Sequence, residues 1–110
     1  MVVLVVWERV GSTRVAPAAT RPPPSSMLAR VPDPRAAQFW DPEQLTAGAI
    51  EEATRRTPGW PTGAFNRSAG VLWDMVFVFP PGARWEREPP LPSYAGGNVV
   101  DVMAEVAKRI

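Results

Sequence analysis

The sequence predicts an α/β fold: a single domain, residues 1–110, in which helices cover a mixed four-stranded sheet. Unbroken β-branched and aromatic runs at 2–7 and 71–79 are typical of strands buried on both faces. Segments with helical spacing separate the first three predicted strands, and such β-α-β crossings favour parallel pairing. A Pro-Pro-Gly turn at 80–82 favours an antiparallel hairpin, so the predicted order is β-α-β-α-β-β-α.

Two strands and a short helix are predicted in the first part of the chain. Val2–Trp7 is a strand because its apolar run is unbroken. Residues 8–24 are a long loop, since Gly, Ser, Thr and Pro occur there without apolar periodicity. Ser25–Val31 is expected to form a short helix with its first residue as the N-cap, and Arg35–Asp41 a second strand.

The clearest predicted helix spans residues 41–56. Asp41 is expected to be its N-cap and Pro42 its first residue, while Gln44 stands three residues after Asp41, as in a capping box. Gly48 weakens the helix by about 1 kcal/mol relative to Ala. The apolar stripe that predicts the helix consists of Leu45, Ala49, Ile50 and Ala53.

The second part is expected to complete the sheet and close with a helix. Residues 57–70 are a second long loop, and Ala83–Arg87 is predicted to return antiparallel to strand 71–79 as an edge strand. Ser93–Asn98 is expected to be a glycine-containing turn that enters the closing helix, with Asn98 as its N-cap. That helix has one apolar face: Val99, Val102, Met103, Val106 and Ile110.

Two absent residue types limit the chemistry of this chain, which has no cysteine and no histidine. Without thiols it has no disulfide, thiolate nucleophile or redox dithiol. Without imidazoles it lacks the commonest metal ligand and the usual base at neutral pH. We therefore expect no metal and no cofactor. Any reaction would have to use carboxylate, Lys/Arg or hydroxyl groups, and the chain can also have no catalytic chemistry.

Charge and hydropathy narrow the expected partners. A net charge of +1 does not favour nucleic acid as a partner. No apolar run approaches the roughly 18 residues of a membrane span. The opening "MVVLVVW" is too short for a signal-peptide core and has no basic segment before it, so we expect a cytoplasmic protein. A protein partner or a small ligand remains.

The strand and turn pattern resembles the thioredoxin fold. The resemblance lies in Val2–Trp7 as first central strand, Gln38–Asp41 as strand passing into helix, Val76–Trp85 as strand-turn-strand, and Asn98–Ile110 as final helix. The stretches "VVWE", "PSSMLARVPDPRAAQFWDPEQL", "LWDMVFVFPPGARW" and "GGNVVDV" are also similar to uncharacterised bacterial thioredoxin-like proteins. The resemblance spans most of the chain and implies a fold rather than an activity.

The sequence departs from that family where thioredoxins do their chemistry. Thioredoxins carry Cys-x-x-Cys just after the first central strand, and here that region is Arg9–Val15. Ser12 or Thr13 cannot replace a thiolate, because hydroxyls stay protonated near neutral pH. The family also places a cis-proline before its third strand, and Trp73 stands there instead. The resemblance therefore implies a redox-inactive domain.

The candidate binding residues lie at or near the expected carboxyl ends of strands, where open α/β sheets bind ligands. They are Glu8, Arg9, Ser12, Arg14, Trp40, Trp73 and Asp74; no residue is predicted to be catalytic. Simpler structural interpretations stay open. Trp40 and Trp73 can pack in the core, Asp41 can serve only as a helix cap, and residues 8–24 can be an ordinary solvated loop.

Three functions follow as alternatives. The first, which we predict, is a module that binds a partner at the face of the former active site. The second is an enzyme without thiol chemistry that uses carboxylate and arginine groups such as Glu8, Asp74 and Arg14. The third is a degenerate or purely structural domain.

Overall fold

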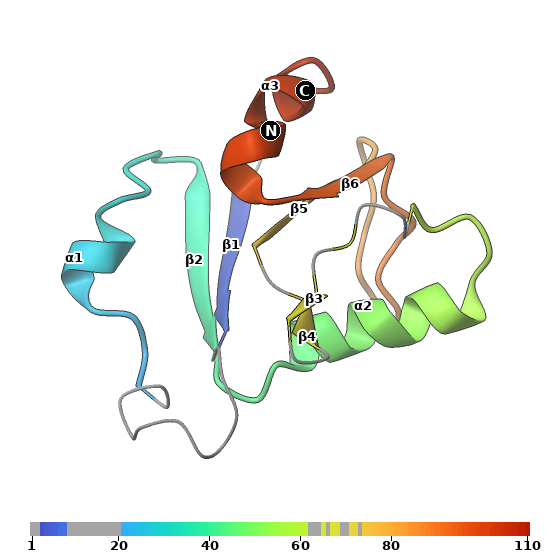
Figure 1. Cartoon of the computed structure of the whole chain (residues 1–110), viewed down its shortest axis with the longest axis horizontal. Coiled ribbons are helices and arrows are strands. Elements are labelled where there is room, and N and C mark those ends of the chain that lie inside the picture. Colours follow the sequence, from blue (N-terminus) through green and yellow to red (C-terminus); the bar gives the residue numbers. More distant parts are fainter. Residues whose placement is uncertain (1–2, 9–20, 62–64, 66, 69–70, 73) are drawn as a thin grey trace. The chain divides into compact units, whose positions relative to one another are not determined.

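The computed structural model confirms an α/β chain (Figure 1). It describes residues 3–8, 21–61, 65, 67–68, 71–72 and 74–110. These residues form three helices and three two-stranded sheets. The chain divides into two compact units, Met1–Thr46 and Ala47–Ile110. The single domain expected over 1–110 stays a prediction.

The first unit is built on a parallel pair of strands, β1 (Val3–Glu8) and β2 (Ala36–Asp41). The register places Val6 opposite Phe39 and Glu8 opposite Asp41. The two predicted strands and the crossing between them are therefore confirmed. Because the pair is parallel, the carboxyl ends of both strands meet at one edge.

A short helix, α1 (Ser25–Leu28), is joined to this strand pair by hydrogen bonds of one glutamine. Gln38 of β2 accepts a hydrogen bond from Trp7 Nε1 at 2.8 Å and donates from Nε2 to the Leu28 carbonyl at 3.1 Å. The expected N-cap is corrected. The cap is Pro24 rather than Ser25, because the Pro24 carbonyl accepts the first helical N–H groups.

The core of the second unit forms around α2 (Leu45–Arg56), which begins at the end of the first unit. Its buried side chains are Ala47, Ile50, Ala53, Trp60 and Leu72. Phe77 packs against this cluster and meets Phe65 edge-on, with ring centroids 5.6 Å apart. It also meets Trp60 edge-on at 6.4 Å. Each such pair adds about 0.5–1.5 kcal/mol beyond its buried area.

The third predicted strand is not continuous. β4 (Val71–Leu72) pairs antiparallel with β3 (Arg67–Ser68), which lies inside the second predicted loop, and β5 (Met75–Val78) begins a separate ladder. Asp74 separates β4 from β5 with φ of 52°, a left-handed conformation. Asp tolerates that conformation far better than β-branched residues, so the break falls there.

The returning strand is β6 (Tyr94–Gly97), which pairs antiparallel with β5. The prediction of an edge strand at Ala83–Arg87 and of a turn at Ser93–Asn98 is therefore wrong. The segment between β5 and β6 is irregular, with Pro89 and Pro92 buried. Small residues suit the partner of β5, because a Cβ at Gly96 would lie only 3.2 Å from Val102 Cγ1 of the closing helix.

The closing helix, α3 (Val99–Ala107), packs on β5 and β6, and Asn98 is its N-cap as predicted. Val106 is buried and Val102 half-buried. Met103 and Ile110 are exposed, which corrects their place on the packed face. The helix therefore buries a narrower stripe than the sequence predicts.

The hydrogen bonds of the described residues do not form one four-stranded sheet. β1 pairs with β2, and β5 pairs with β6, each in its own two-stranded sheet. The parallel crossing and the antiparallel hairpin are both present, but no described ladder joins them.

Two glycines offer a matched test of this packing. A Cβ at Gly48 meets nothing within 4 Å, so Gly48→Ala should stabilise α2 by about 0.5–1 kcal/mol. A Cβ at Gly96 would lie 2.6 Å from Tyr94 Oη and 3.2 Å from Val102 Cγ1 of α3, so Gly96→Ala should destabilise the protein by about 1–3 kcal/mol. Urea unfolding measures both. Equal effects of the two variants would contradict this packing of β6 against α3.

Candidate functional site

The predicted site residues fall into three groups. Glu8 and Trp40 lie at the carboxyl ends of β1 and β2 in the first unit. Asp74 is exposed in the second unit, between β4 and β5. The remaining four, Arg9, Ser12, Arg14 and Trp73, lie outside the described residues. Of the described candidates, Glu8 and Trp40 are therefore brought together at the carboxyl end of the β1–β2 pair, whereas Asp74 lies in the other unit.

The connection from β2 to α2 shapes this end of the strands. Gln44 has φ of 58°, and its N–H reaches the Asp41 carbonyl at 3.4 Å, so residues 42–44 form a turn. This corrects the helix start. Asp41 ends β2 instead of occupying the N-cap position, and Pro42 and Gln44 precede the helix instead of lying in its first turn.

The Asp41 carboxylate nevertheless caps the helix, although Asp41 itself stands four residues before the first helical residue, Leu45. Its Oδ2 accepts a hydrogen bond from the Thr46 N–H at 2.7 Å. Partial burial of this carboxyl group acts to raise its pKa, but bonds from the backbone N–H groups of Thr46, Leu45 and Glu43 together outweigh it. The pKa of Asp41 therefore lies below its usual value, and the carboxylate is ionised at neutral pH.

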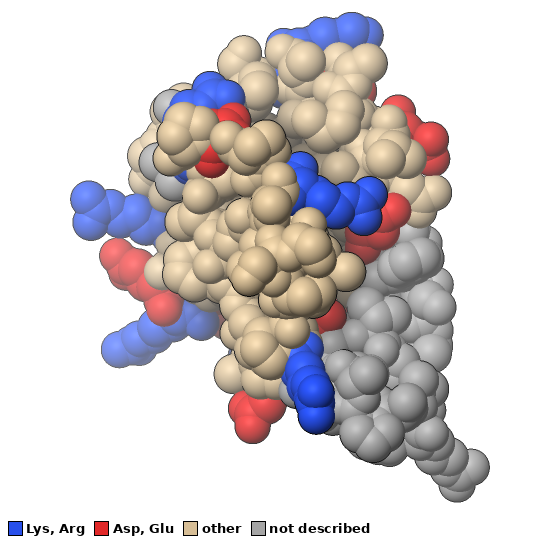
Figure 2. Space-filling view, turned by 90° about the vertical axis from the view of Figure 1, so that its left-hand side faces the viewer, with Lys and Arg blue, Asp and Glu red and all other residues tan. Residues whose placement is uncertain are grey.

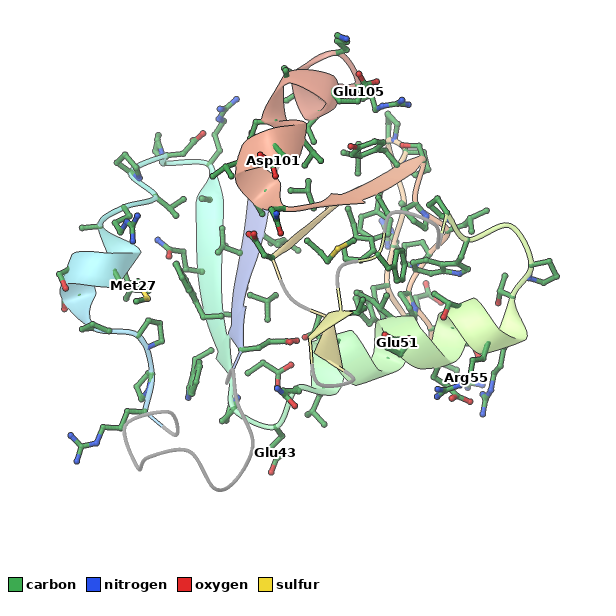
Figure 3. All side chains as sticks on the ribbon, in the orientation of Figure 1. Met27, Glu43, Glu51, Arg55, Asp101 and Glu105 are labelled. Atoms are coloured by element: carbon green, nitrogen blue, oxygen red, sulfur yellow. The ribbon has the colours of Figure 1, made fainter. Side chains whose placement is uncertain are left out.

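Beside this connection lies an open hollow of about 400 Å³. Phe39 and Leu45 contribute exposed apolar surface, with 54% and 67% of their areas accessible. Glu43 also lines it, and its side chain extends away from the connection (Figure 3). The complete lining is Val6, Phe39, Trp40, Asp41, Pro42, Glu43, Leu45 and Thr46.

The apolar part of the hollow continues along one face of the strand pair. Side chains alternate between faces, so Leu4 and Val6 of β1 share a face with Phe39 of β2. All three are exposed. Sequence reasoning singled out Trp40 and missed Phe39 and Leu45. A signal for Phe39 was present in the sequence. Phe39 and Trp40 are consecutive aromatic residues of one strand, so they point to opposite faces, and each face of the strand carries an apolar side chain.

Charged side chains of both signs lie on the face that Figure 2 shows. On the face in Figure 2, Lys/Arg and Asp/Glu side chains are scattered around a broad uncharged area. Among the residues that the structure describes, no group of three or more His, Cys, Asp or Glu is placed to hold a metal ion. None of the described helices has the length and apolar character needed to cross a membrane.

Comparison of the chain with protein-family models, with curated proteins and with solved structures finds no match. The candidate site therefore rests on its geometry and on the chemistry of its side chains.

The Asp41 cap predicts a defined pH dependence of stability. Asp41→Ala removes the bond to the Thr46 N–H and should lower the free energy of unfolding by about 1 kcal/mol at pH 7. Asp41→Asn keeps an oxygen acceptor and should lose only the contribution of the charge.

The direction of this pH dependence follows from the pKa of Asp41, which is lower in the folded state than in the unfolded state. The contribution of the charge is fully present above the unfolded pKa, near 3.8, and is lost as pH falls through the folded value. The difference between the native protein and Asp41→Asn in urea unfolding should therefore shrink as the pH is lowered from 5 through the acid range. A difference that does not change over this range would contradict the capping role of the charge.

Proposed function

We propose that this protein is a binding module that holds a partner protein at the carboxyl end of the β1–β2 pair. The observation that carries the proposal is the hollow in which Phe39 and Leu45 expose more than half of their surface beside Asp41 and Glu43. Apolar groups next to orienting charges are typical of binding sites. Such exposure costs solubility, and a partner would remove it from water.

The chemistry of the hollow favours binding over catalysis. A carboxyl group that works as a general acid near neutral pH needs a raised pKa, whereas the pKa of Asp41 is lowered by the N–H groups around it. The side chains of Glu43 and Asp74 are both exposed, so neither carboxylate is held in a buried site. The alternative of an enzyme based on carboxylate and arginine groups therefore has less support.

We also propose that the chain has a redox-inactive thioredoxin-like fold, in which β1 and β5 lie side by side in one sheet. The support is the order of elements, the parallel β1–β2 pair and the antiparallel β5–β6 pair followed by α3. The fourth strand in this proposal is β6. The absence of cysteine excludes thiol–disulfide exchange whatever the fold.

The sheet proposal predicts backbone contacts between β1 and β5. In a uniformly ¹⁵N-labelled sample, amide protons of residues 3–8 should show nuclear Overhauser effects to residues 75–78. Effects between β1 and β2 serve as the internal control. If the control contacts appear and those between β1 and β5 do not, the thioredoxin-like proposal is wrong.

The binding proposal predicts a loss of affinity when Phe39 is truncated. Peptides selected from a displayed random library on the native protein should bind Phe39→Ala at least about tenfold more weakly, because truncated aromatic anchors lose the most affinity. Val100→Ala is the matched control, since Val100 is 83% exposed and belongs to α3. Failure to select any peptide, or equal affinity for all three proteins, would overturn the proposal.

A further inference from the structure

The partner that suits the hollow has a definite chemistry. We propose that it is a protein segment that presents an apolar side chain next to a lysine or arginine. This inference rests on the proposed function and adds the class of partner to it. Three features of the first unit carry it: the charges at the strand ends, the helix start that Asp41 already occupies, and the openness of the hollow.

Among the described residues, three carboxylates lie at this end of the strand pair. Asp41 and Glu43 line the hollow, and none of its described lining residues is a lysine or arginine. Glu8 lies opposite Asp41 in the ladder and adds a third carboxylate to the same strand ends. A cationic partner would therefore gain electrostatic attraction here, and an anionic one would be repelled.

The arginine nearest to β2 in sequence belongs to the other end of the strand. Arg35 directly precedes β2 and pairs with Asp33 at 2.6 Å, whereas Asp41 is the last residue of β2. At about 3.3 Å per residue, the strand separates them by roughly 20 Å. This is about two and a half times the screening length at physiological salt, so the Arg35 charge has little effect at the hollow.

The start of α2 does not offer a site for an anion. The first N–H groups of a helix attract anions. Here the carboxylate of Asp41 already accepts the N–H of Thr46, and hydrogen bonds from Leu45 and Glu43 help lower its pKa. A phosphate or a partner carboxylate would have to displace Asp41. The same carboxylate therefore blocks an anion and contributes to the attraction of a cation.

The shape of the hollow favours a protein segment over an enclosed small molecule. Its volume of about 400 Å³ is near the lower end of small-molecule pockets, which usually bury most of their ligand. Phe39 and Leu45 remain more than half exposed, so a ligand here would keep one side in water. One apolar side chain on Phe39 and Leu45, with a basic neighbour reaching Glu43, fits this arrangement.

The test uses the full chain and three fluorescein-labelled octapeptides of alternating residues: Leu and Arg, Leu and Glu, and Ser and Arg. Fluorescence anisotropy at low salt measures their affinities. The Leu–Arg peptide should bind at least about tenfold more tightly than either of the others, and added salt should weaken it. Equal or tighter binding of the Leu–Glu peptide, or no binding of the Leu–Arg peptide, would overturn the inference.

A charge-matched pair of variants separates a local effect from the effect of net charge. Glu43→Lys should weaken the Leu–Arg peptide by about three- to tenfold and strengthen the Leu–Glu peptide. Glu86→Lys makes the same change in net charge on an exposed residue of the segment between β5 and β6 and should change neither affinity. Equal effects of the two variants would overturn the inference.

One further variant distinguishes failure of this inference from failure of the proposed function. If Glu43→Lys has no effect but Phe39→Ala still weakens the Leu–Arg peptide, the binding site stands and its preference for a cation is wrong. If Phe39→Ala binds all peptides as the native protein does, the hollow is not the binding site and both proposals fail.

Discussion

The hydrogen bond from the Thr46 N–H to the Asp41 carboxylate is the interaction on which the described site depends. It joins the last residue of β2 to the first turn of α2. Pro42 has no N–H to donate, and the left-handed backbone of Gln44 prevents the helix from starting earlier. The carboxylate therefore fixes where the strand ends, where the helix begins and where the hollow lies between them.

The parallel strand pair shows how alternation gives its two faces different roles. On one face, Gln38 joins Trp7 to α1 by two hydrogen bonds, so its polar group is satisfied within the unit. The other face carries Leu4, Val6 and Phe39, which remain exposed. The binding proposal uses only the end of that exposed face, where apolar surface and carboxylates meet.

Local patterns predicted the elements whose cause is local. The strands β1 and β2 followed from apolar runs, the helices α2 and α3 from apolar periodicity, and the start of α3 from its N-cap. Two features had no clear local signal. Asp74 breaks an apolar run through its backbone conformation, and β6 pairs with β5 despite its poor β-formers, with Gly96 close to Val102 of α3. At the site, Trp40 and Glu8 were anticipated, whereas Leu45 was assigned to a packed stripe that it does not join.

The conformation of the irregular segment between β5 and β6 also determines whether another protein can bind its prolines. Pro89 and Pro92 have the three-residue spacing that SH3-type and WW-type domains recognise in an extended, left-handed polyproline helix. Such a domain contacts the proline rings directly, whereas Pro89 and Pro92 are both buried here. The segment would first have to leave its place against the rest of its unit. The folded chain thus conceals a proline motif that an unfolded or cleaved chain would display.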